Sequence, residues 1–569
     1  MKFDELSIKK SIIINIGIIL GLIFILPLVL NLIEYNFRVL LISTLGNYVI
    51  LVLIFVLIID FVYIVFKRQN YYIFSLFNVY LTIFMFILMM YSFLNNIYEI
   101  VYVMNYSNST LSLIYKIVAI WAGEDGSIMT WMVFNSIIIS LYRLKNQNRE
   151  DLVFIRSVII SIIISIIFLI VLFSLNPFQI NSPPDFPNGL GLNPLLISPF
   201  MIWHPFFTFI AYAIFLIPFT ITIAETITRK EKLLGTYQQD FYTFSLKFGW
   251  LVLSLGIGLG AYWAKIALTP WGRYWGWDPV ETVSLIPWFF ITAFFHTMIF
   301  KKKNPKLINI NVGLIFSSIV FSTLITRGGG LSSAHAFAEG AELVIWVVVL
   351  GLILIIFSLY VIYIVLDYLM EEYRNKKLLF DYFSYLFLFG LAFVCTFGLF
   401  VPPFTYILSN FLPLDIILIE IDYYIITTLI LATGLALSLT FCSLWEYFEI
   451  KWIGLVILIG FSIQSVLSFI LVITSNIWIN PVLFIYLISL FSSLFKLIKN
   501  FNMKKGVKYF FRLNSKTIIH AGISLILAGF LMNSNYQDIF FIPGFILLLI
   551  GIIPSILITF FPTKKIIEA

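Results

Sequence analysis

Four histidines occur in the chain, and their side chains are the first that could do chemistry: His204, His296, His335 and His520. Imidazole is the commonest metal ligand in proteins. A second distinctive feature is the run W-G-R-Y-W-G-W-D-P-V-E, from Trp271 to Glu281. Its three tryptophans, one tyrosine and one arginine lie within seven residues. This composition predicts a flat, aromatic surface with a positive charge, suited to hold a flat anionic macrocycle.

A helix is predicted directly after this run. Asp278 has the N-cap position, Pro279 the first helical position, and Glu281 lies three residues beyond the cap. The N-cap position alone is a sufficient structural role for Asp278. From there to Lys301 the chain is apolar except for a few hydroxyls, Glu281 and His296. At 1.5 Å per residue, His296 would lie roughly 27 Å along the axis from Asp278. One helix would therefore connect the aromatic run with a histidine near the opposite membrane face.

The composition predicts a membrane protein. Of the 569 residues 61% are hydrophobic and 11% charged, and the mean hydropathy is +1.04, whereas about 25% of a soluble domain is charged. Apolar runs of about 18 or more residues recur along the whole chain, and about 16 of them are expected to span the bilayer. We therefore expect an all-α polytopic integral membrane protein with short loops.

The distribution of basic residues predicts the orientation. Most of the 35 lysines and arginines fall on one side of the predicted spans, in loops or at helix ends such as the one near Arg143. By the positive-inside rule, both termini are cytoplasmic and the aromatic run faces outward from the plasma (inner) membrane. The net charge of +7 therefore reflects topology, and no nucleic acid partner is expected.

The same topology sorts the histidines into two pairs. His204 and His335 fall at the outer surface, flanking the aromatic run. His296 and His520 fall about one turn inside the inner surface, on different helices. Each histidine alone could be a satisfied core or interface residue, but intramembrane histidines are functional by default. Paired neutral imidazoles are the axial ligands of six-coordinate haem iron, so the placement as two pairs favours haem ligation.

Other membrane protein classes fit these features less well. Cytochrome b of quinol oxidoreductases carries two histidines on each of two helices, whereas here each histidine has its own helix or loop. A haem-copper oxidase needs more histidines than this chain has. A transporter would be expected to show broken helices with charged residues at the midplane. The acidic residues of this chain lie mostly at helix ends.

Some residues carry weaker signals. Glu124 and Asp125, in W-A-G-E-D-G-S, are unusual beside a bilayer. They fit either a re-entrant turn that caps the next helix or a direct function. The two cysteines, Cys395 and Cys442, lie in apolar runs and form no CxxC motif. We expect them to be inert core residues.

The aromatic run resembles the tryptophan-rich WWD signature of a haem-handling superfamily that includes the CcmF, CcmC and CcsA families. Three further segments resemble the CcmF family of cytochrome c biogenesis proteins in particular. They are N-S-T-L-S-L-I-Y-K-I-V-A-I-W-A-G-E-D-G-S, G-L-G-L-N-P-L-L-I-S-P-F-M-I-W-H-P and T-R-G-G-G-L-S-S-A-H-A-F-A. The resemblance covers about residues 91–337, and the segment H-A-G-I-S-L at His520 is a weaker match.

The resemblance implies two haem sites. His204 and His335 would bind a substrate haem b at the outer aromatic run, with Trp203 beside it and Arg327 near its propionates. His296 and His520 would bind a second, inner haem b. The implied activity is that of a haem lyase, which attaches haem to the thiols of a CxxCH motif in apocytochrome c. The implied catalytic surface consists of Trp271, Arg273, Tyr274, Trp275, Trp277 and Asp278.

The resemblance also implies an electron donor and partners. Haem must be ferrous for attachment in this family, so the inner haem would relay electrons from membrane quinol. A CcmE-like haem chaperone and a CcmH-like thiol protein are the implied partners, besides apocytochrome c. Two alternatives stay open: a haem transporter or receptor without lyase chemistry, and a quinol-linked membrane electron-transfer subunit.

The chain departs from the family pattern at several places. Tyr274 stands where CcmF proteins usually have a tryptophan, Arg273 replaces a small residue, and Glu124 replaces a commoner histidine. An outer β-domain after the fifteenth helix is reduced to a few residues. The expected regions are anchor helices in residues 1–66, the haem-handling core in 67–340, scaffold helices in 341–498, and the basic inner loop with the last helices in 499–569.

Overall fold

The computed structural model describes residues 2–228, 236–267, 273–297, 305–327, 376–409, 411–413, 415–471, 479–501 and 506–560. Within these ranges every regular element is a helix, and extended pairing is limited to one bridge between Ile100 and Ile180. Fourteen of the described helices are long and apolar enough to cross a membrane. The prediction of an all-α polytopic membrane protein is confirmed.

Two of the expected 16 spans are not among the fourteen helices found in the described residues. The first helix, α1 (Lys2–Asn31), has a described apolar stretch, Gly17–Asn31, that is shorter than a membrane span. A further expected span follows residue 340 and falls in 328–375, outside the described residues. The structure therefore bears out the class of fold and leaves the total number of spans as a prediction.

The chain divides into two compact units, Met1–Arg229 and Lys230–Ala569. The four regions expected from the sequence were defined by function and stay a prediction. The first unit consists of α1 and the helices α2 (Tyr35–Lys67), α3 (Ile73–Leu94), α4 (Val101–Tyr106), α5 (Leu113–Val118), α6 (Glu124–Lys145), α7 (Leu152–Leu175) and α8 (Pro199–Thr228), with 3₁₀ turns at Ala119–Trp121 and Pro194–Leu196.

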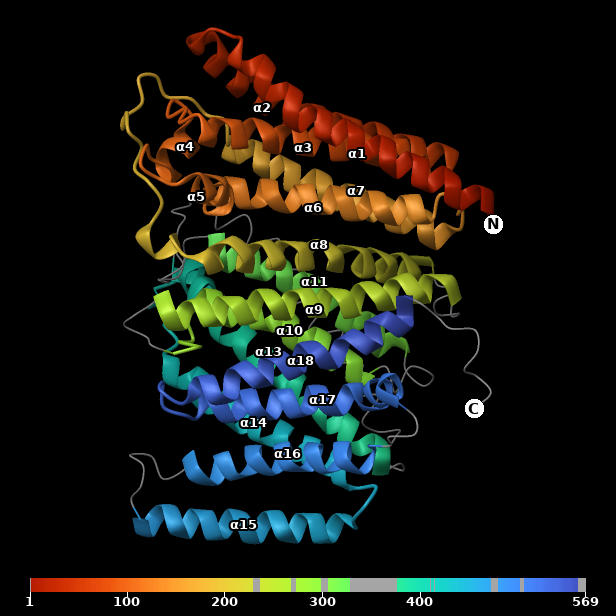
Figure 1. Ribbon diagram of the computed structural model, residues 1–569, viewed down its shortest axis with the longest axis vertical. Coiled ribbons are helices and arrows are strands. Elements are labelled where there is room, and N and C mark those ends of the chain that lie inside the picture. Colours follow the sequence, from red (N-terminus) through yellow and green to blue (C-terminus); the bar gives the residue numbers. More distant parts are fainter. Residues whose placement is uncertain are drawn as a thin grey trace. The chain divides into compact units, whose positions relative to one another are not determined.

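Four long helices form the centre of the first unit (Figure 1). Helix α2 packs on α3 and α7, and α6 packs on α3, α7 and α8. The helix starts follow from local chemistry, because the side chains of Glu34 and Asp151 accept hydrogen bonds from backbone N–H groups in the first turns of α2 and α7. Such caps satisfy N–H groups that have no partner within the helix.

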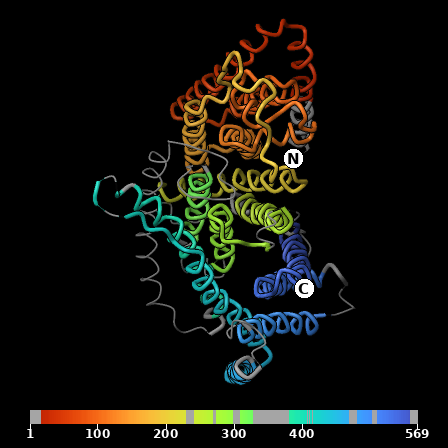
Figure 2. Tube along the Cα trace, turned by 90° about the vertical axis from the view of Figure 1, so that its left-hand side faces the viewer, coloured from red at the N-terminus to blue at the C-terminus, as the bar shows by residue number. Residues whose placement is uncertain are grey.

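The second unit contains the two histidines predicted near the inner surface. Its helices are α9 (Thr236–Ala267), α10 (Pro279–Thr297), α11 (Pro305–Arg327), α13 (Lys376–Ser409), α14 (Ile421–Leu444), α15 (Ile450–Leu471), α16 (Ile479–Lys499), α17 (Gly506–Phe530) and α18 (Gln537–Phe560). Six of these helices pack in a closed circuit, because α10 contacts α9 and α13, α14 contacts α13 and α17, and α18 contacts α17 and α9. Figure 2 shows α9 next to the α17 and α18 pair.

Glycines bring α17 and α18 unusually close together. A Cβ atom at Gly522 would lie 2.6 Å from the carbonyl oxygen of Gly544, and one at Gly544 would lie 2.8 Å from the carbonyl oxygen of Gly522. Farther along the pair, the Ser515 hydroxyl donates a hydrogen bond to the carbonyl oxygen of Gly551. Small residues of this kind let two membrane helices approach at the backbone, where van der Waals contact stabilises the pair.

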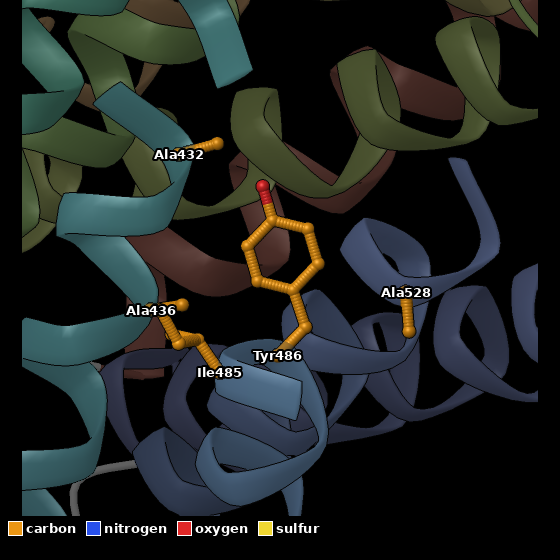
Figure 3. Close-up of a cluster of buried hydrophobic side chains, with 5 residues drawn as sticks. All are labelled: Ala432, Ala436, Ile485, Tyr486 and Ala528. Atoms are coloured by element: carbon orange, nitrogen blue, oxygen red, sulfur yellow. The ribbon is translucent and has the colours of Figure 1, made fainter. Parts of the chain in front are cut away.

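A tyrosine joins the helices on the other side of α17. The ring of Tyr486, on α16, lies between α14 and α17 (Figure 3). Alanines on both neighbours leave room for the ring, and the buried cluster consists of Ala432, Ala436, Ile485, Tyr486 and Ala528. The hydroxyl of Tyr486 lies 3.4 Å from the hydroxyl of Thr433. Helix α17 is thus fixed between α18 on one side and α14 and α16 on the other.

The first prediction concerns the glycine contact. We expect Gly544→Val to lower the stability of the purified protein by about 1–3 kcal/mol, because the added atoms meet backbone that cannot rotate away. Thermal unfolding in detergent measures the change. Gly454→Val is the matched control, since no atom lies within 4 Å of a Cβ at Gly454. Equal unfolding temperatures for the two variants would contradict the close packing of α17 and α18.

Candidate functional site

The imidazoles of His296 and His520 lie close together in the second unit, with nearly parallel planes. His296 lies in the last turn of α10 and His520 lies in the middle of α17. Their ring centroids are 6.4 Å apart and their planes differ by 9°. The two residues are more than 200 positions apart in the sequence, so their meeting is a product of the fold. The two rings lie side by side, as a shared depth requires, and their depth below the inner surface stays a prediction.

This separation suits a metal ion between the two rings. Zinc sites show that a metal ion binds an imidazole nitrogen at about 2.0 Å, so two imidazoles on opposite sides of one metal ion have their ring centroids about 6 Å apart. In the described part of the chain, no group of three or more His, Cys, Asp or Glu side chains could hold a metal ion. Two opposed imidazoles are the ligand set of a six-coordinate haem iron, whose other ligands come from the porphyrin.

A hydrogen bond determines which ring nitrogen of His296 keeps its lone pair. Its Nδ1 lies 3.0 Å from the carbonyl oxygen of Thr292, one turn earlier in α10. A carbonyl oxygen only accepts, so Nδ1 carries the hydrogen and Nε2 keeps its lone pair for a metal. Metal-binding histidines usually have such a partner, which fixes both tautomer and ring orientation.

Two tryptophans hold the residue that orients His296. The indole N–H of Trp250, on α9, donates to the hydroxyl of Thr292 over 2.9 Å, and this hydroxyl donates to the carbonyl oxygen of Trp288 over 2.6 Å. The Trp250 and Trp288 rings stack with centroids 5.9 Å apart. Trp288 also donates to the hydroxyl of Ser254 over 2.8 Å. Helices α9 and α10 are thereby fixed at the level of the imidazole.

The segment H-A-G-I-S-L explains the position of His520. Gly522 allows the close approach of α17 to α18. The Ser524 hydroxyl donates to the carbonyl oxygen of His520 over 2.9 Å and lies 2.9 Å from the Ser489 hydroxyl on α16. The residues that follow His520 therefore pack α17 against both neighbours, and they set the position of the imidazole.

The predicted start of α10 is confirmed. The carboxylate of Asp278 accepts a hydrogen bond from the backbone N–H of Val280 over 2.9 Å, and the helix begins at Pro279. Glu281 differs from the expected pattern in one respect. Its carboxylate accepts from the backbone N–H of Gly276 over 2.8 Å, so it stabilises the preceding aromatic loop.

Tyr274 anchors this loop to α18. The ring is buried, with 1% exposed, and stacks on Phe541 at a centroid distance of 4.0 Å. Its hydroxyl donates to the carboxylate of Asp538 over 2.6 Å, and the ammonium group of Lys265 lies 2.5 Å from the same carboxylate oxygen. Burial, together with the hydrogen bond to Asp538, raises the pKa of the Tyr274 hydroxyl, so it remains a donor at neutral pH. These contacts support a structural role for Tyr274.

The other two described aromatic residues of the loop take different planes. Trp277 stacks on Tyr424 of α14, with centroids 5.9 Å apart and 10° between planes. Trp275 is perpendicular to Trp277, at 82°. The expectation of one flat aromatic surface is therefore wrong for these residues. The backbone of Trp277 has a φ of +58°, a left-handed conformation that costs about 1–3 kcal/mol in a non-glycine residue and that clusters at functional sites.

The indole N–H of Trp275 is buried and has no hydrogen-bond partner among the described residues. Buried polar groups almost always have a partner, so each exception needs an explanation. Tyr274 and Trp277 fix the loop on either side of it, and Trp275 is half-buried between them. The N–H can donate to an acceptor on a bound molecule.

The remaining predicted site residues are placed as follows. Arg273 is exposed, and Trp203 is 52% exposed on α8 with its ring stacked on Phe207. His204 lies inside α8, in the second turn after the helix begins at Pro199. Trp271 and His335 lie outside the described residues, and Arg327 is the last residue of α11, with a side chain that is not described.

The two weaker signals have structural explanations. Glu124 and Asp125 occupy the first turn of α6, where negative charge is favourable, and the N-cap residue is Gly123. Cys395 is buried and Cys442 partly buried, as expected for core residues. Sequence reasoning missed Tyr424 and Phe541 as the partners of the aromatic loop, because they lie in apolar runs that resemble any other span.

The fold and the site together define an all-α polytopic membrane protein with an opposed pair of imidazoles between its helices. Residues 121–331 match the family model described as cytochrome C assembly protein. The matched part contains Trp203, His204, the aromatic loop and His296. His520 lies outside it, so the structure connects His520 to the site independently of the match.

Several curated proteins are similar to this chain. The cytochrome c-type biogenesis protein CcmF of Haemophilus influenzae is 34% identical over 254 residues, which cover 44% of this chain and 38% of that protein. The CcmF protein of Escherichia coli is 32% identical over 262 residues, covering 45% of this chain and 39% of that protein. The probable cytochrome c-type biogenesis protein NrfE of Escherichia coli is 31% identical over 252 residues, covering 44% and 45%.

The resemblance to CcmF-type cytochrome c biogenesis proteins, predicted from four sequence segments, is confirmed by these matches. The match spans less than half the length of each of these relatives. No solved structure matches the chain.

The second prediction concerns the anchor of the aromatic loop. Tyr274→Phe keeps the stacked ring but removes the donor to Asp538, and a hydrogen bond to a charged group contributes about 1.5–3 kcal/mol. We expect faster amide hydrogen exchange in the peptide that contains residues 273–278. Tyr536→Phe is the control, because Tyr536 is 58% exposed near the same end of α18. Unchanged exchange in Tyr274→Phe would show that the hydroxyl does not hold the loop.

Proposed function

We propose that this protein acts in cytochrome c biogenesis and binds a haem b between His296 and His520. The observation that carries the proposal is the closeness of these two imidazoles, whose ring centroids are 6.4 Å apart and whose planes differ by 9°. The family match over residues 121–331 supports a role in cytochrome c assembly. The names of the similar proteins, cytochrome c-type biogenesis proteins, point to the same process.

The surrounding residues fit a haem with two histidine ligands. Thr292 keeps the hydrogen of His296 on Nδ1, so Nε2 can bind iron. Trp250 and Trp288 fix Thr292, and Ser524 bonds the backbone of His520. A bound haem b would supply one-electron chemistry. The role of these residues is to orient the two imidazoles inside an apolar bundle.

The aromatic loop is proposed as part of an outer site for the haem that is to be attached. Trp275 offers a buried N–H donor, and Arg273 offers an exposed guanidinium for a propionate. Trp271, Trp277 and Asp278 complete the loop, with Tyr274 as its anchor. The roles of His204 and His335 as ligands, and of Trp203 and Arg327 beside them, come from the resemblance to the CcmF family.

In this proposal the protein is the haem lyase component of cytochrome c maturation. Haem held at the outer site would be attached to the thiols of a CxxCH motif in apocytochrome c. Quinol would deliver electrons through the inner haem, and CcmE-like and CcmH-like proteins would bring haem and reduced thiols. The outer site would face away from the cytoplasm, with both termini cytoplasmic, as the distribution of lysine and arginine indicates.

The third prediction tests the inner site. We expect His520→Ala, and separately His296→Ala, to remove one haem with two imidazole ligands from the purified protein, because one imidazole alone cannot complete the axial pair. Absorption spectra and pyridine-haem quantification measure the loss. His204→Ala is the control and should leave this haem in place. A spectrum of His520→Ala identical to that of the unaltered protein, in a variant that elutes as a folded monodisperse species, would refute the assignment.

A fourth prediction separates a lyase from a haem transporter or an electron-transfer subunit. In a strain that lacks its own haem lyase component but supplies haem and apocytochrome c, the protein should yield cytochrome c with covalently bound haem. Trp275→Ala should reduce this yield at least tenfold while the inner haem stays bound. Haem that reaches the outer side without covalent attachment would favour a transporter, and steady quinol oxidation with soluble acceptors would favour an electron-transfer subunit.

A further inference from the structure

A lysine lies one helical turn from the proposed inner haem site. Lys516 precedes His520 by four residues on α17, and residues four apart lie on the same face of a helix, about 6 Å apart along its axis. Lys516 is exposed and His520 is partly exposed, whereas their neighbours Thr517 and Ala521 are buried. The ammonium group and the imidazole therefore share a face of α17 that is accessible to a bound molecule.

The charge of Lys516 acts on both imidazoles of this site. Its ammonium group is close enough to interact electrostatically with His520 and also with His296, which belongs to α10. Since the two histidines lie on different helices, the ammonium group is near the space between α10 and α17 and not only beside its own helix. A molecule that binds both rings would therefore come within reach of Lys516.

The positive charge of Lys516 is not balanced by a carboxylate. Among the described residues it forms no ion pair and donates no hydrogen bond. Lys496, on α16, also interacts with His520, but its ammonium group lies 3.1 Å from the carboxylate of Glu446. A further ammonium group, that of Lys247 on α9, is near enough to Lys516 for the two charges to repel one another. An anion between like charges removes such a repulsion, so this place favours a negatively charged group.

The two features, opposed imidazoles and an ammonium group one turn away, match two parts of one ligand. The iron of haem b takes the imidazoles as axial ligands on opposite faces of the porphyrin. The same molecule carries two propionate carboxylates on one edge, and these extend beyond the axial ligands. A lysine ammonium group has three donors and forms strong, charge-assisted hydrogen bonds with a carboxylate. The spacing along α17 thus suits iron at His520 and a propionate at Lys516.

We infer that Lys516 binds a propionate of the haem between His296 and His520, so that the propionate edge of this haem points toward the N-terminal end of α17. The inference rests on the proposed function, because it assumes that a haem occupies this site. Two axial imidazoles alone leave the porphyrin free to rotate about the iron, and a contact at one edge removes this freedom. The ammonium group also offsets the negative charge of the propionate, which favours the ferrous form of the iron.

Haem titration of the full-length protein, purified in detergent from haem-limited cells, tests this inference. All variants carry His204→Ala, so that the proposed outer site does not contribute. We expect Lys516→Gln to weaken haem binding about three- to tenfold and to lower the midpoint potential, because the propionate charge is no longer offset. Lys516→Arg keeps the charge and should restore both values. Lys451→Gln is the matched control, since Lys451 is exposed and pairs with Glu449 over 2.7 Å.

Haem dimethyl ester, whose propionates are esterified and uncharged, provides the second measurement. We expect Lys516→Gln and the protein with Lys516 to bind this ester equally well. A loss of affinity of the same size for haem and for the ester would overturn the inference, because the lysine would then act through the fold. Unchanged affinity and potential in Lys516→Gln, for a haem that His520→Ala removes, would overturn it and leave the proposed haem site intact. Absence of any haem that depends on His520 would refute the site itself and this inference with it.

Discussion

A polar group inside a membrane-spanning bundle has to find its hydrogen-bond partner within the protein, because the hydrocarbon offers none. Two pairings in this chain follow from that constraint. Arg143 meets Asp60, and His296 meets the carbonyl oxygen of Thr292. Each pairing also fixes a direction in space, since hydrogen bonds weaken steeply when misaligned. The same constraint that would destabilise isolated polar groups therefore orients the side chains of the candidate site.

The two candidate haem sites depend on one pair of helices. Helix α18 carries Asp538 and Phe541, which hold the aromatic loop through Tyr274. Helix α17 carries His520 and lies directly against α18 through Gly522 and its partner glycine. A shift of α17 along α18 would therefore move the inner imidazole relative to the aromatic loop. The close packing of the pair fixes the separation of these two groups along the axes of α17 and α18.

The sequence predicted what depends on local patterns. The hydropathy predicted the helices, and the cap residue Asp278 predicted the start of α10. The alternation of the predicted spans put His296 and His520 on the same side of the membrane. Contacts between distant helices could not be predicted, because side-chain packing decides which faces meet. Tyr424, for example, receives the Trp277 ring, yet nothing in its neighbourhood distinguishes it. Arg143, expected at a helix end, is buried against a carboxylate more than 80 residues earlier.

Helices α10 and α17 each pack on other neighbours, and in the described part of the chain they share little packed surface with one another. The imidazole of His296, on α10, and that of His520, on α17, are the side chains that lie close together between these two helices. A ligand that binds both rings would link the two helices, and by mass action it would shift the equilibrium toward the folded protein. The abundance of intact protein in the membrane would then track the supply of that ligand. Chains without the ligand would unfold more often, and proteases would therefore degrade them faster than chains that have bound it.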